Sequence, residues 1–360
     1  MAIAALPPPA TQTGVGAWLR KHFFSTWYDA ILSLIFLALI FWVVSGIWTW
    51  GLRDAIWTVE NRDACGHGVG ACWAVIQDRH RLILFGLYPY EEHWRSTLAC
   101  LAVIATMILS CVPLFWTVWR LPILWIVGFG TFVLLMRGGF AGLPLVTTEQ
   151  WGGLSLTIFI FSAVFVLGMP LAVILAFARR SSLPVIARVT GIFIDVFRSL
   201  PLLTILFAAA VVVPLVLPDW LQGDKLGRVI IGFSLFFAAY QAEIIRAGLQ
   251  SIPDGQVEAA VSLNMPFWSQ VVDIQLPQAF RNTLPSTINQ AVITFKETSI
   301  VTIIGFFEVM ASGNAVVGTG EWGQQYVEVY LFLAFIYFIF VFGLSRYGAW
   351  LETRMRLGHG

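Results

Sequence analysis

Residues 250–266 read Gln250-Ser-Ile-Pro-Asp-Gly-Gln-Val-Glu-Ala-Ala-Val-Ser-Leu-Asn-Met-Pro266, a polar stretch between two long apolar segments. The polar character continues through Ile274-Gln-Leu-Pro277 to Asn282. Gln, Asp, Glu, Ser and Asn recur every few residues, and the hydrocarbon core of a membrane does not accommodate such a sequence. Residues 250–282 are therefore predicted to form a loop at one membrane face.

The helix caps and breakers in this loop predict two short helices joined by a tight turn. Asp254 is suited to cap the first helix. Ala259 and Ala260 favour helix and have almost no side chain, so the backbone of another protein can approach closely there. Asn264 tolerates the left-handed conformation that ends a helix, and Pro266 suits the first turn of the next one. The loop is predicted to be a small helical hairpin in water, with an ordinary interfacial loop helix as the plain alternative.

The composition indicates an all-α integral membrane protein. The chain has 360 residues, of which 58% are hydrophobic and 11% charged, with a mean hydropathy of +0.81. A net charge of +1 gives no reason to expect a nucleic-acid partner. About eight segments are apolar over the roughly 20 residues that span a bilayer. They lie near residues 29–50, 97–116, 121–137, 154–178, 186–216, 227–246, 284–304 and 327–348.

The Lys and Arg residues of the short loops predict that both termini and loop 250–282 are cytoplasmic. With the N-terminus inside, eleven basic residues lie on the inner side and only three in the short outer loops. The inner residues are Arg20, Lys21, Arg120, Arg179, Arg180, Arg188, Arg246, Arg281, Arg346, Arg354 and Arg356; the outer ones are Arg137, Lys225 and Arg228. Residues 1–28 and 351–360 are accordingly predicted to be cytoplasmic tails.

The long outer loop, residues 51–96, contains Cys65 and Cys72. An oxidising compartment outside the membrane favours a disulfide between them. A metal site at Cys65, His67 and Cys72 is one alternative, although this spacing fits no standard zinc pattern, and two free thiols are another. The sequence predicts no metal site elsewhere.

Charged residues in or beside the predicted spans are candidates for a substrate path. A charge at the centre of a span costs about 2.5–3.5 kcal/mol, so each needs water or a partner. In one interpretation, Lys296, Glu297, Thr298 and Arg198 line the path. In the other, ion pairs such as Arg198 with Glu297, or Glu243 with Lys296, only hold helices together. Glu243 and Arg246, three residues apart, are predicted to pair on one helix face.

No motif of an enzyme is found. The chain lacks Gly-x-x-x-x-Gly-Lys-Ser/Thr, Gly-x-Ser-x-Gly and His-Glu-x-x-His, and its five histidines lie in the tails or in loop 51–96. The chain is therefore predicted to be non-catalytic and to hold no cofactor of its own.

Loop 250–282 resembles the EAA loop of the permease subunits of ABC importers. The resemblance rests on Glu258-Ala259-Ala260, three residues to Asn264 and nine more to Ile274-x-Leu276-Pro277. The family usually has Gly at the position of Asn264, and Asn is the next best residue for a left-handed turn. The resemblance implies docking of the loop on a cytoplasmic ATPase. The implied coupling residues are Gly255, Gln256, Glu258, Ala259, Ala260, Asn264 and Pro277.

Further motifs resemble the five-helix, MetI-like core of type I importer permeases for polar amino acids. They follow one another as Thr157, Arg198-Ser-Leu-Pro201, Tyr240-x-x-Glu243-x-x-Arg246, the EAA loop and Lys296-Glu-Thr-Ser299. The resemblance covers residues 150–350. Residues 29–149, with three further spans, resemble the N-terminal extension of general L-amino-acid permeases.

The resemblance implies a permease subunit of an ATP-driven amino-acid importer in a bacterial inner membrane. Its implied partners are a second, homologous permease subunit, two ATPase subunits that bind ATP and Mg²⁺, and a periplasmic amino-acid-binding protein. Two other functions remain open. An ion-coupled secondary transporter leaves the polar loop unexplained and predicts an inverted repeat, which the sequence does not show. A membrane protein with only a structural or assembly role is the third.

Overall fold

The computed structural model describes residues 14–60, 63, 65, 70–115, 117, 119–318 and 320–357, with side chains through residue 354. Helices dominate this part of the chain, and its only β-pairing consists of two isolated bridges. The described chain forms two compact units, residues 1–78 and 79–360. Each unit is described by itself below.

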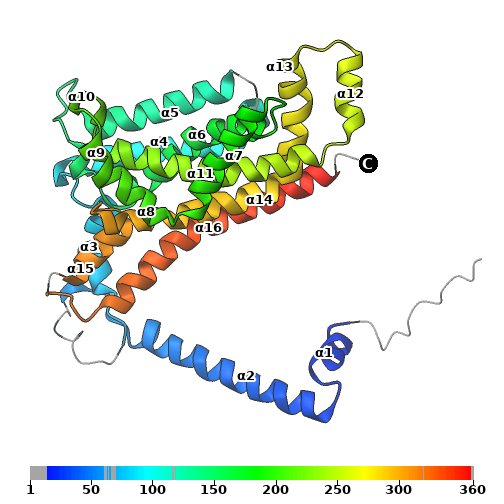
Figure 1. The fold of residues 1–360 in the computed structure, drawn as a ribbon. Coiled ribbons are helices and arrows are strands. Elements are labelled where there is room, and N and C mark those ends of the chain that lie inside the picture. The colour runs from blue at the N-terminus through cyan, green and yellow to red at the C-terminus, as the bar shows by residue number, and fades with distance from the viewer. Residues whose placement is uncertain are drawn as a thin grey trace, which may run out of the picture. The chain divides into compact units, whose positions relative to one another are not determined.

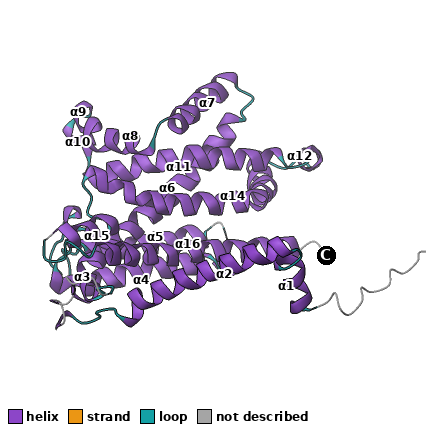
Figure 2. Ribbon diagram, turned by 90° about the horizontal axis from the view of Figure 1, so that it is seen from below, coloured by secondary structure: helices purple, strands orange, loops and turns teal. Residues whose placement is uncertain are grey.

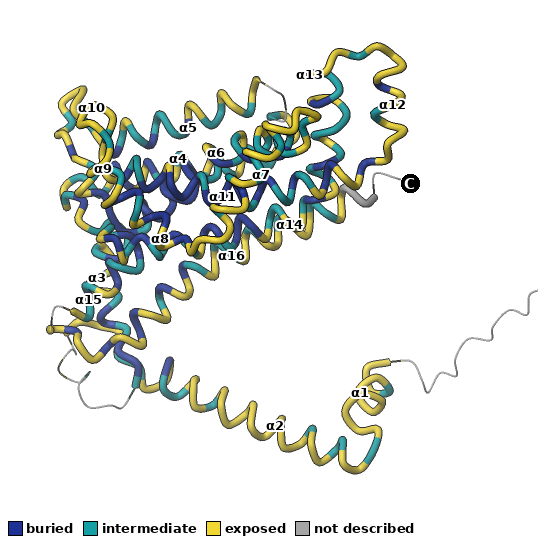
Figure 3. Tube along the Cα trace, in the orientation of Figure 1, coloured by how far each residue is buried: buried dark blue, intermediate teal, exposed yellow. Residues whose placement is uncertain are grey.

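The first unit contains one long apolar helix. Helix α1 (Val15–Phe23) lies within the segment predicted as a tail, so that segment is partly helical. Helix α2 (Trp27–Trp48) follows and continues as one π-helical turn to Arg53. Thr26 accepts a hydrogen bond from the Asp29 backbone and so caps α2. Apolar side chains cover α2 on all sides and none is buried, as the yellow and teal tube in Figure 3 shows, which is typical of a helix surrounded by lipid.

The second unit is a helical bundle. The helices that follow α3 (Ala74–Phe85), which begins in the first unit, are these: α4 (His93–Ser110), α5 (Arg120–Arg137), α6 (Gly153–Arg179), α7 (Pro184–Ser199), α8 (Leu202–Phe207), α9 (Val213–Val216), α10 (Asp219–Gln222), α11 (Lys225–Gln250), α12 (Asp254–Ser262), α13 (Phe267–Ser269), α14 (Leu276–Glu297), α15 (Val309–Gly318) and α16 (Tyr326–Leu357).

Helix α11 lies at the centre of this bundle. It packs against α6 on one side and α14 on another, and α16 packs against α14 (Figures 1 and 2). The hairpin of α4 and α5 joins the same core through α6, where Phe132 stacks on Phe159 with ring centroids 4.8 Å apart. Gly168 gives α6 close access to α11, because a Cβ there would lie 2.4 Å from the Phe237 ring.

The number of spans differs from the predicted eight. Within the described residues, six helices are long and apolar enough to cross a membrane, and a seventh span results if α7 to α9 count as one. The predicted span 186–216 is broken by a bend of 103° beside Pro201, which cannot continue the hydrogen bonds of a helix. The predicted span 284–304 corresponds to α14, which is 22 residues long but too polar for the same criterion.

The last helix is longer than expected. Helix α16 runs to Leu357, so most of the predicted tail 351–360 is its final turns. A domain boundary was predicted between residues 149 and 150. Compactness does not separate the chain there, because α4 and α5 share a hydrophobic core with α6.

Candidate functional site

The first arm of the predicted hairpin is α12, and it ends as the sequence predicts. Asn264 adopts the left-handed conformation, with a φ of 52°. The N–H of Asn264 donates to the Val261 carbonyl over 2.9 Å, and the N–H of Met265 donates to the Ala260 carbonyl over 3.1 Å. These two bonds form a Schellman motif, which satisfies the last carbonyls of the helix. Asn in place of Gly therefore preserves the turn.

The second arm differs from the prediction of a separate short helix. Pro266 precedes α13, which continues through a π-helical segment, Gln270–Gln275, directly into α14. Pro277 lies in the first turn of α14, where its missing N–H is tolerated after the wider π-helical turn. The hairpin therefore has one short arm and one arm that belongs to the bundle.

Polar contacts hold the turn of the hairpin and its base, where α11 ends beside α14. The Asn282 side-chain amide donates to the Ser251 hydroxyl over 2.8 Å, and the Gln270 amide donates to the Met265 carbonyl over 2.7 Å. Gly248 permits close packing of α11 on α14, because a Cβ there would lie 2.6 Å from the Ala279 carbonyl. A rigid attachment follows, and Figure 1 shows the hairpin of α12 and α13 projecting from one end of the bundle.

Most predicted coupling residues lie on the surface of the hairpin. Gly255, Gln256, Glu258, Ala259 and Asn264 are exposed, as is Pro277 at the base of the second arm. The structure corrects the role expected for Ala260, which is 2% exposed because its own chain covers it. Close approach of another protein is therefore open at Ala259 and not at Ala260.

The hairpin also presents apolar side chains that the sequence interpretation did not single out. Leu263, Phe267 and Trp268 are 76%, 60% and 73% exposed, and Val261 is 60% exposed. Their proximity to Glu258 and Ala259 makes one mixed apolar and polar surface, which we call the hairpin face. A cluster of large apolar side chains on a polar loop is typical of a protein interface.

A second cluster of functional residues surrounds Glu243 near the same end of α11. Arg246 donates to the Glu243 carboxylate over 2.9 Å, which confirms the pair predicted from their spacing. Arg179 of α6 lies 3.1 Å from the same carboxylate and also pairs with Asp195 of α7 over 3.0 Å. The Glu243 cluster therefore ties α6, α7 and α11 together.

Arg198 belongs to this cluster and not to the predicted path around α14. Its guanidinium lies 3.8 Å from the Glu243 carboxylate and over the Tyr240 ring, 5.3 Å from the centroid. The Tyr240 hydroxyl donates to the Arg198 carbonyl over 3.1 Å. The suggested ion pairs of Arg198 with Glu297 and of Glu243 with Lys296 are therefore wrong.

Lys296, Glu297 and Thr298 lie at the end of α14 that is far from the hairpin. Lys296 is exposed, whereas Glu297 is half-buried, as expected from the angle of about 100° between neighbouring residues of a helix. Within the described residues, neither forms an ion pair, and one Glu297 carboxylate oxygen is buried without a hydrogen bond. Thr298 is buried and donates to the Phe295 carbonyl. Asn282, Ser286 and Asn289 are exposed at helical spacing from Lys296, so a polar stripe runs along α14.

Glu308 is a buried acid that the sequence interpretation missed. Its carboxylate accepts hydrogen bonds from the backbone N–H groups of Met310 and Ala311, at 2.8 and 3.0 Å, and from the Thr302 hydroxyl at 2.6 Å. The Thr157 hydroxyl of α6 contacts it at 3.2 Å. Burial raises the pKa of Glu308, and these hydrogen bonds oppose that shift. The acid thus caps α15 and joins it to α6.

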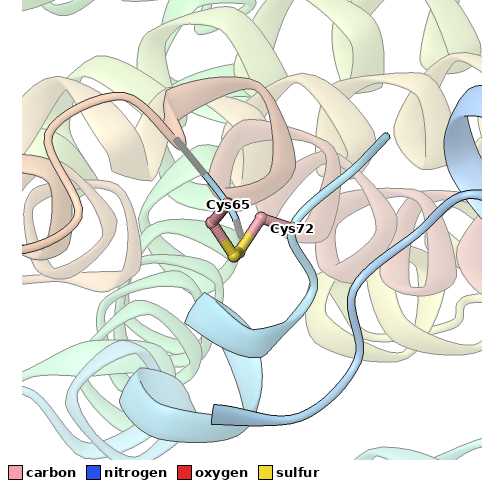
Figure 4. The surroundings of a disulfide bond; sticks show 2 residues. All are labelled: Cys65 and Cys72. Atoms are coloured by element: carbon pink, nitrogen blue, oxygen red, sulfur yellow. A yellow bond between two sulfur atoms is a disulfide. The ribbon is translucent and has the colours of Figure 1, made fainter. Parts of the chain in front are cut away.

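Cys65 and Cys72 form a disulfide, shown in Figure 4. Ile56 pairs with Cys72 in a short β-bridge, and the Trp73 indole N–H donates to the Gly51 carbonyl over 2.8 Å. Of the alternatives left open for these cysteines, the structure has the disulfide. His67, the third member of the alternative metal site, lies outside the described residues.

Comparison with known proteins identifies a protein family that matches this chain. Residues 168–357, more than half of the chain, match the family described as binding-protein-dependent transport system inner membrane component. The chain is 37% identical to the inner membrane amino-acid ABC transporter permease protein YhdY of Escherichia coli K12, over 98% of this chain and 96% of that protein.

Two other relatives differ in how much of the chain they cover. The glutamate/glutamine/aspartate/asparagine transport system permease protein BztC of Rhodobacter capsulatus is 30% identical, over 99% of this chain and 97% of its own length. The glutamate/aspartate import permease protein GltK of Escherichia coli O6:H1 is 35% identical but covers only 56% of this chain, with 91% of its own length aligned. Some relatives therefore share the full length of this chain, and others share little more than half of it.

Proposed function

Because the chain belongs to the family of binding-protein-dependent transport system inner membrane components, we propose that it is the permease subunit of an ATP-driven importer of amino acids. Its relatives carry the names of amino-acid permeases, and the proposal extends that substrate class to this chain. In this function the chain forms one half of the path for the amino acid and hydrolyses nothing itself.

The observation that carries the proposal is the hairpin face. Leu263, Phe267 and Trp268 are exposed on a loop too polar for lipid, so a partner protein is needed to cover them. We assign that partner as the cytoplasmic ATPase, which holds the ATP and Mg²⁺. Glu258, Gln256 and Gly255 then form the polar rim of the contact, and Ala259 lets the ATPase backbone approach.

The substrate path is assigned to the polar stripe of α14. Lys296 is an exposed cation without an ion-pair partner within the described residues, and Glu297 carries a carboxylate oxygen without a hydrogen bond. Lys296 complements the carboxylate of an amino acid. Glu297 points about 100° away from Lys296 and is half-buried, so it lies beside the stripe and not on it. A second permease subunit, covering the same stripe from the other side, completes the path, and a periplasmic binding protein delivers the substrate.

The proposed location is a bacterial inner membrane, with both termini and the hairpin in the cytoplasm. The excess of Lys and Arg in the short loops on that side supports this orientation. The disulfide between Cys65 and Cys72 supports the oxidising side for the loop at the other membrane face.

Uptake by proteoliposomes tests the proposal. The chain is reconstituted together with the second permease subunit and the ATPase. ATP is enclosed inside the vesicles, and the binding protein and a radiolabelled amino acid are added outside. Uptake is expected to require ATP and to be abolished by Glu258→Lys and by Ala259→Trp, because both obstruct the hairpin face. Glu149→Lys, an exposed acid far from the hairpin in sequence and structure, is the matched control and should transport normally.

Two results would contradict the proposal. Uptake driven by an ion gradient with no ATPase present would make the chain a secondary transporter. Normal ATP-driven uptake by both hairpin variants would show that the ATPase docks elsewhere.

A further inference from the structure

A pocket of about 520 Å³ lies where the end of α3 meets the start of α4. It belongs to the end of the bundle opposite the hairpin of α12 and α13 (Figures 1 and 2). Its lining combines charged and aromatic side chains, among them Arg81, Tyr90, Glu91, His93 and Trp94. None of these residues belongs to the hairpin face, the Glu243 cluster or the polar stripe of α14.

The pocket contains two opposite charges that do not neutralise each other. The Arg81 guanidinium carbon lies 4.3 Å from the centroid of the Tyr90 ring, a cation–π contact that holds the group and leaves its charge uncompensated. Glu91 is exposed at the same pocket. Within the part of the chain that the structure describes, no ion pair joins Arg81 to Glu91. One cationic and one anionic group therefore remain available to a ligand.

The aromatic wall of the pocket is held in place. The His93 ring stacks on Phe85 with centroids 4.3 Å apart and lies 5.2 Å from the Tyr90 ring. Nε2 of His93 lies 3.0 Å from the Tyr88 carbonyl, so this nitrogen carries the hydrogen and donates. The wall is thus ordered before any ligand arrives.

The position of the pocket along α4 indicates the depth of lipid headgroups. Tyr90 and Trp94 are 63% and 51% exposed at the start of this apolar helix, and such aromatic side chains gather at the membrane–water interface. Leu98, Leu101 and Ile108 are exposed further along the helix, at the spacing of one helical face. The pocket therefore opens onto an apolar stripe, which we call the α4 stripe.

We propose that this pocket binds the zwitterionic headgroup of a membrane phospholipid that carries a phosphate and a primary ammonium. Arg81 contacts the phosphate, Glu91 contacts the ammonium, and the acyl chains lie along the α4 stripe. A free amino acid has a similar pair of charges but no chains to cover Leu98 and Leu101, so the stripe favours the lipid. The inference requires only that the chain spans a membrane and does not depend on the proposed transport function.

Native mass spectrometry of the purified full chain tests this site. The protein in detergent is equilibrated with equal amounts of phosphatidylethanolamine and phosphatidylglycerol. Wild type is expected to retain phosphatidylethanolamine in about tenfold preference, since a charge-assisted contact commonly changes affinity by that factor. Glu91→Gln should bring the ratio close to one, because both lipids share the phosphate and only one has the ammonium. Arg81→Gln should lower retention of both.

Matched controls are available at the same end of the bundle. Arg137→Gln and Glu149→Gln remove exposed charges outside the pocket and should leave the lipid ratio unchanged. Thermal unfolding of each variant shows whether the fold is intact. A wild-type ratio near one, or equal ratios for Glu91→Gln and Glu149→Gln, would overturn the proposal.

A competition experiment separates the lipid from a soluble zwitterion. Leu98→Gln with Leu101→Gln should weaken retention of the lipid, and O-phosphoethanolamine or glutamate should not displace it. Displacement by either small molecule, combined with normal retention by the stripe variant, would show that the pocket binds a free zwitterion and that the lipid assignment is wrong.

Discussion

The Glu243 cluster and the end of α14 both place charges in apolar surroundings, and the two regions treat those charges differently. Around Glu243, three arginines and two acids from three helices form ion pairs over 2.9–3.8 Å. At the end of α14, Lys296 and Glu297 have no ion-pair partner within the described residues. The ion pairs of the first region hold three helices together, whereas the charges of the second region are open to a ligand.

This difference teaches how to interpret charged residues in membrane proteins. A charge that is costly to hold near lipid is retained either because it fixes helices or because it acts on something else. A set of partners inside the chain indicates the first reason, and the lack of partners indicates the second. Substitutions in the two regions should therefore separate stability from transport.

The largest loss of stability is expected for Glu243→Gln. This change leaves Arg179, Arg198 and Arg246 without their shared acid. Breaking a fully buried ion pair on one side costs about 3–5 kcal/mol, and we expect a loss at the lower end of that range because Glu243 is 15% exposed. Thermal unfolding in detergent measures the effect, with Asp273→Asn on the exposed second arm of the hairpin as the control. Equal stabilities of the two variants would contradict the role of the cluster as a joint.

Glu308→Ala is expected to cost a comparable amount. Glu308 has hydrogen-bond donors as partners instead of cations, and each buried donor that loses its acceptor costs about 1–3 kcal/mol. Met310, Ala311 and Thr302 all lose their acceptor in this variant, whereas Thr302→Val removes only one hydrogen bond and should cost about 1 kcal/mol. If Thr302→Val is as harmful as Glu308→Ala, the cap is not the source of the stability.

Arg198→Gln should have a smaller effect. The Arg198 side chain is 38% exposed and its distance to Glu243 is 3.8 Å, so the pair contributes about 0.2–1 kcal/mol. Glu243 keeps two other arginines in this variant. A loss as large as that of Glu243→Gln would mean that Arg198, and not the cluster as a whole, fixes α7.

Lys296→Ala should change stability least and transport most. An exposed side chain without a partner contributes within about 0.5 kcal/mol to folding. Loss of a charged contact with the substrate should lower uptake by about tenfold in the proteoliposome assay, and Lys296→Arg should retain part of it. Unchanged uptake by Lys296→Ala would remove this residue from the proposed path.

Local sequence rules predicted the end of α12 but not its start. Asn264 was predicted from its tolerance of the left-handed conformation and the pair Glu243–Arg246 from its spacing, whereas the N-cap is Pro253 and not the predicted Asp254. The prediction for the second arm was wrong, because Pro266 and Pro277 suggested two helix boundaries. A π-helical turn accommodates Pro277, and no residue in the sequence predicts that turn.

Contacts between distant helices could not be predicted in this way. The partners of Arg198 and the contact between Thr157 and Glu308 depend on which helices lie side by side, and periodicity shows only the faces of single helices. The bounds of one span differ for a related reason. Helix α14 lies between α11 and α16 and need not be apolar all round, so hydropathy predicted a span at 284–304 but did not locate the helix ends at Leu276 and Glu297.

The joining of α13 to α14 has a mechanical consequence. From Phe267 to Glu297 the backbone stays helical with no intervening loop, and Figure 1 shows that the α13 arm meets α14 at an angle. The near end of this helical stretch carries Trp268 of the hairpin face, and its far end carries Lys296. A push or twist on Trp268 therefore passes into α14 through helical backbone and not through a loop. The winding departs from regular at the π-helical segment Gln270–Gln275 and at Pro285 inside α14, and these are the natural points for the helix to flex.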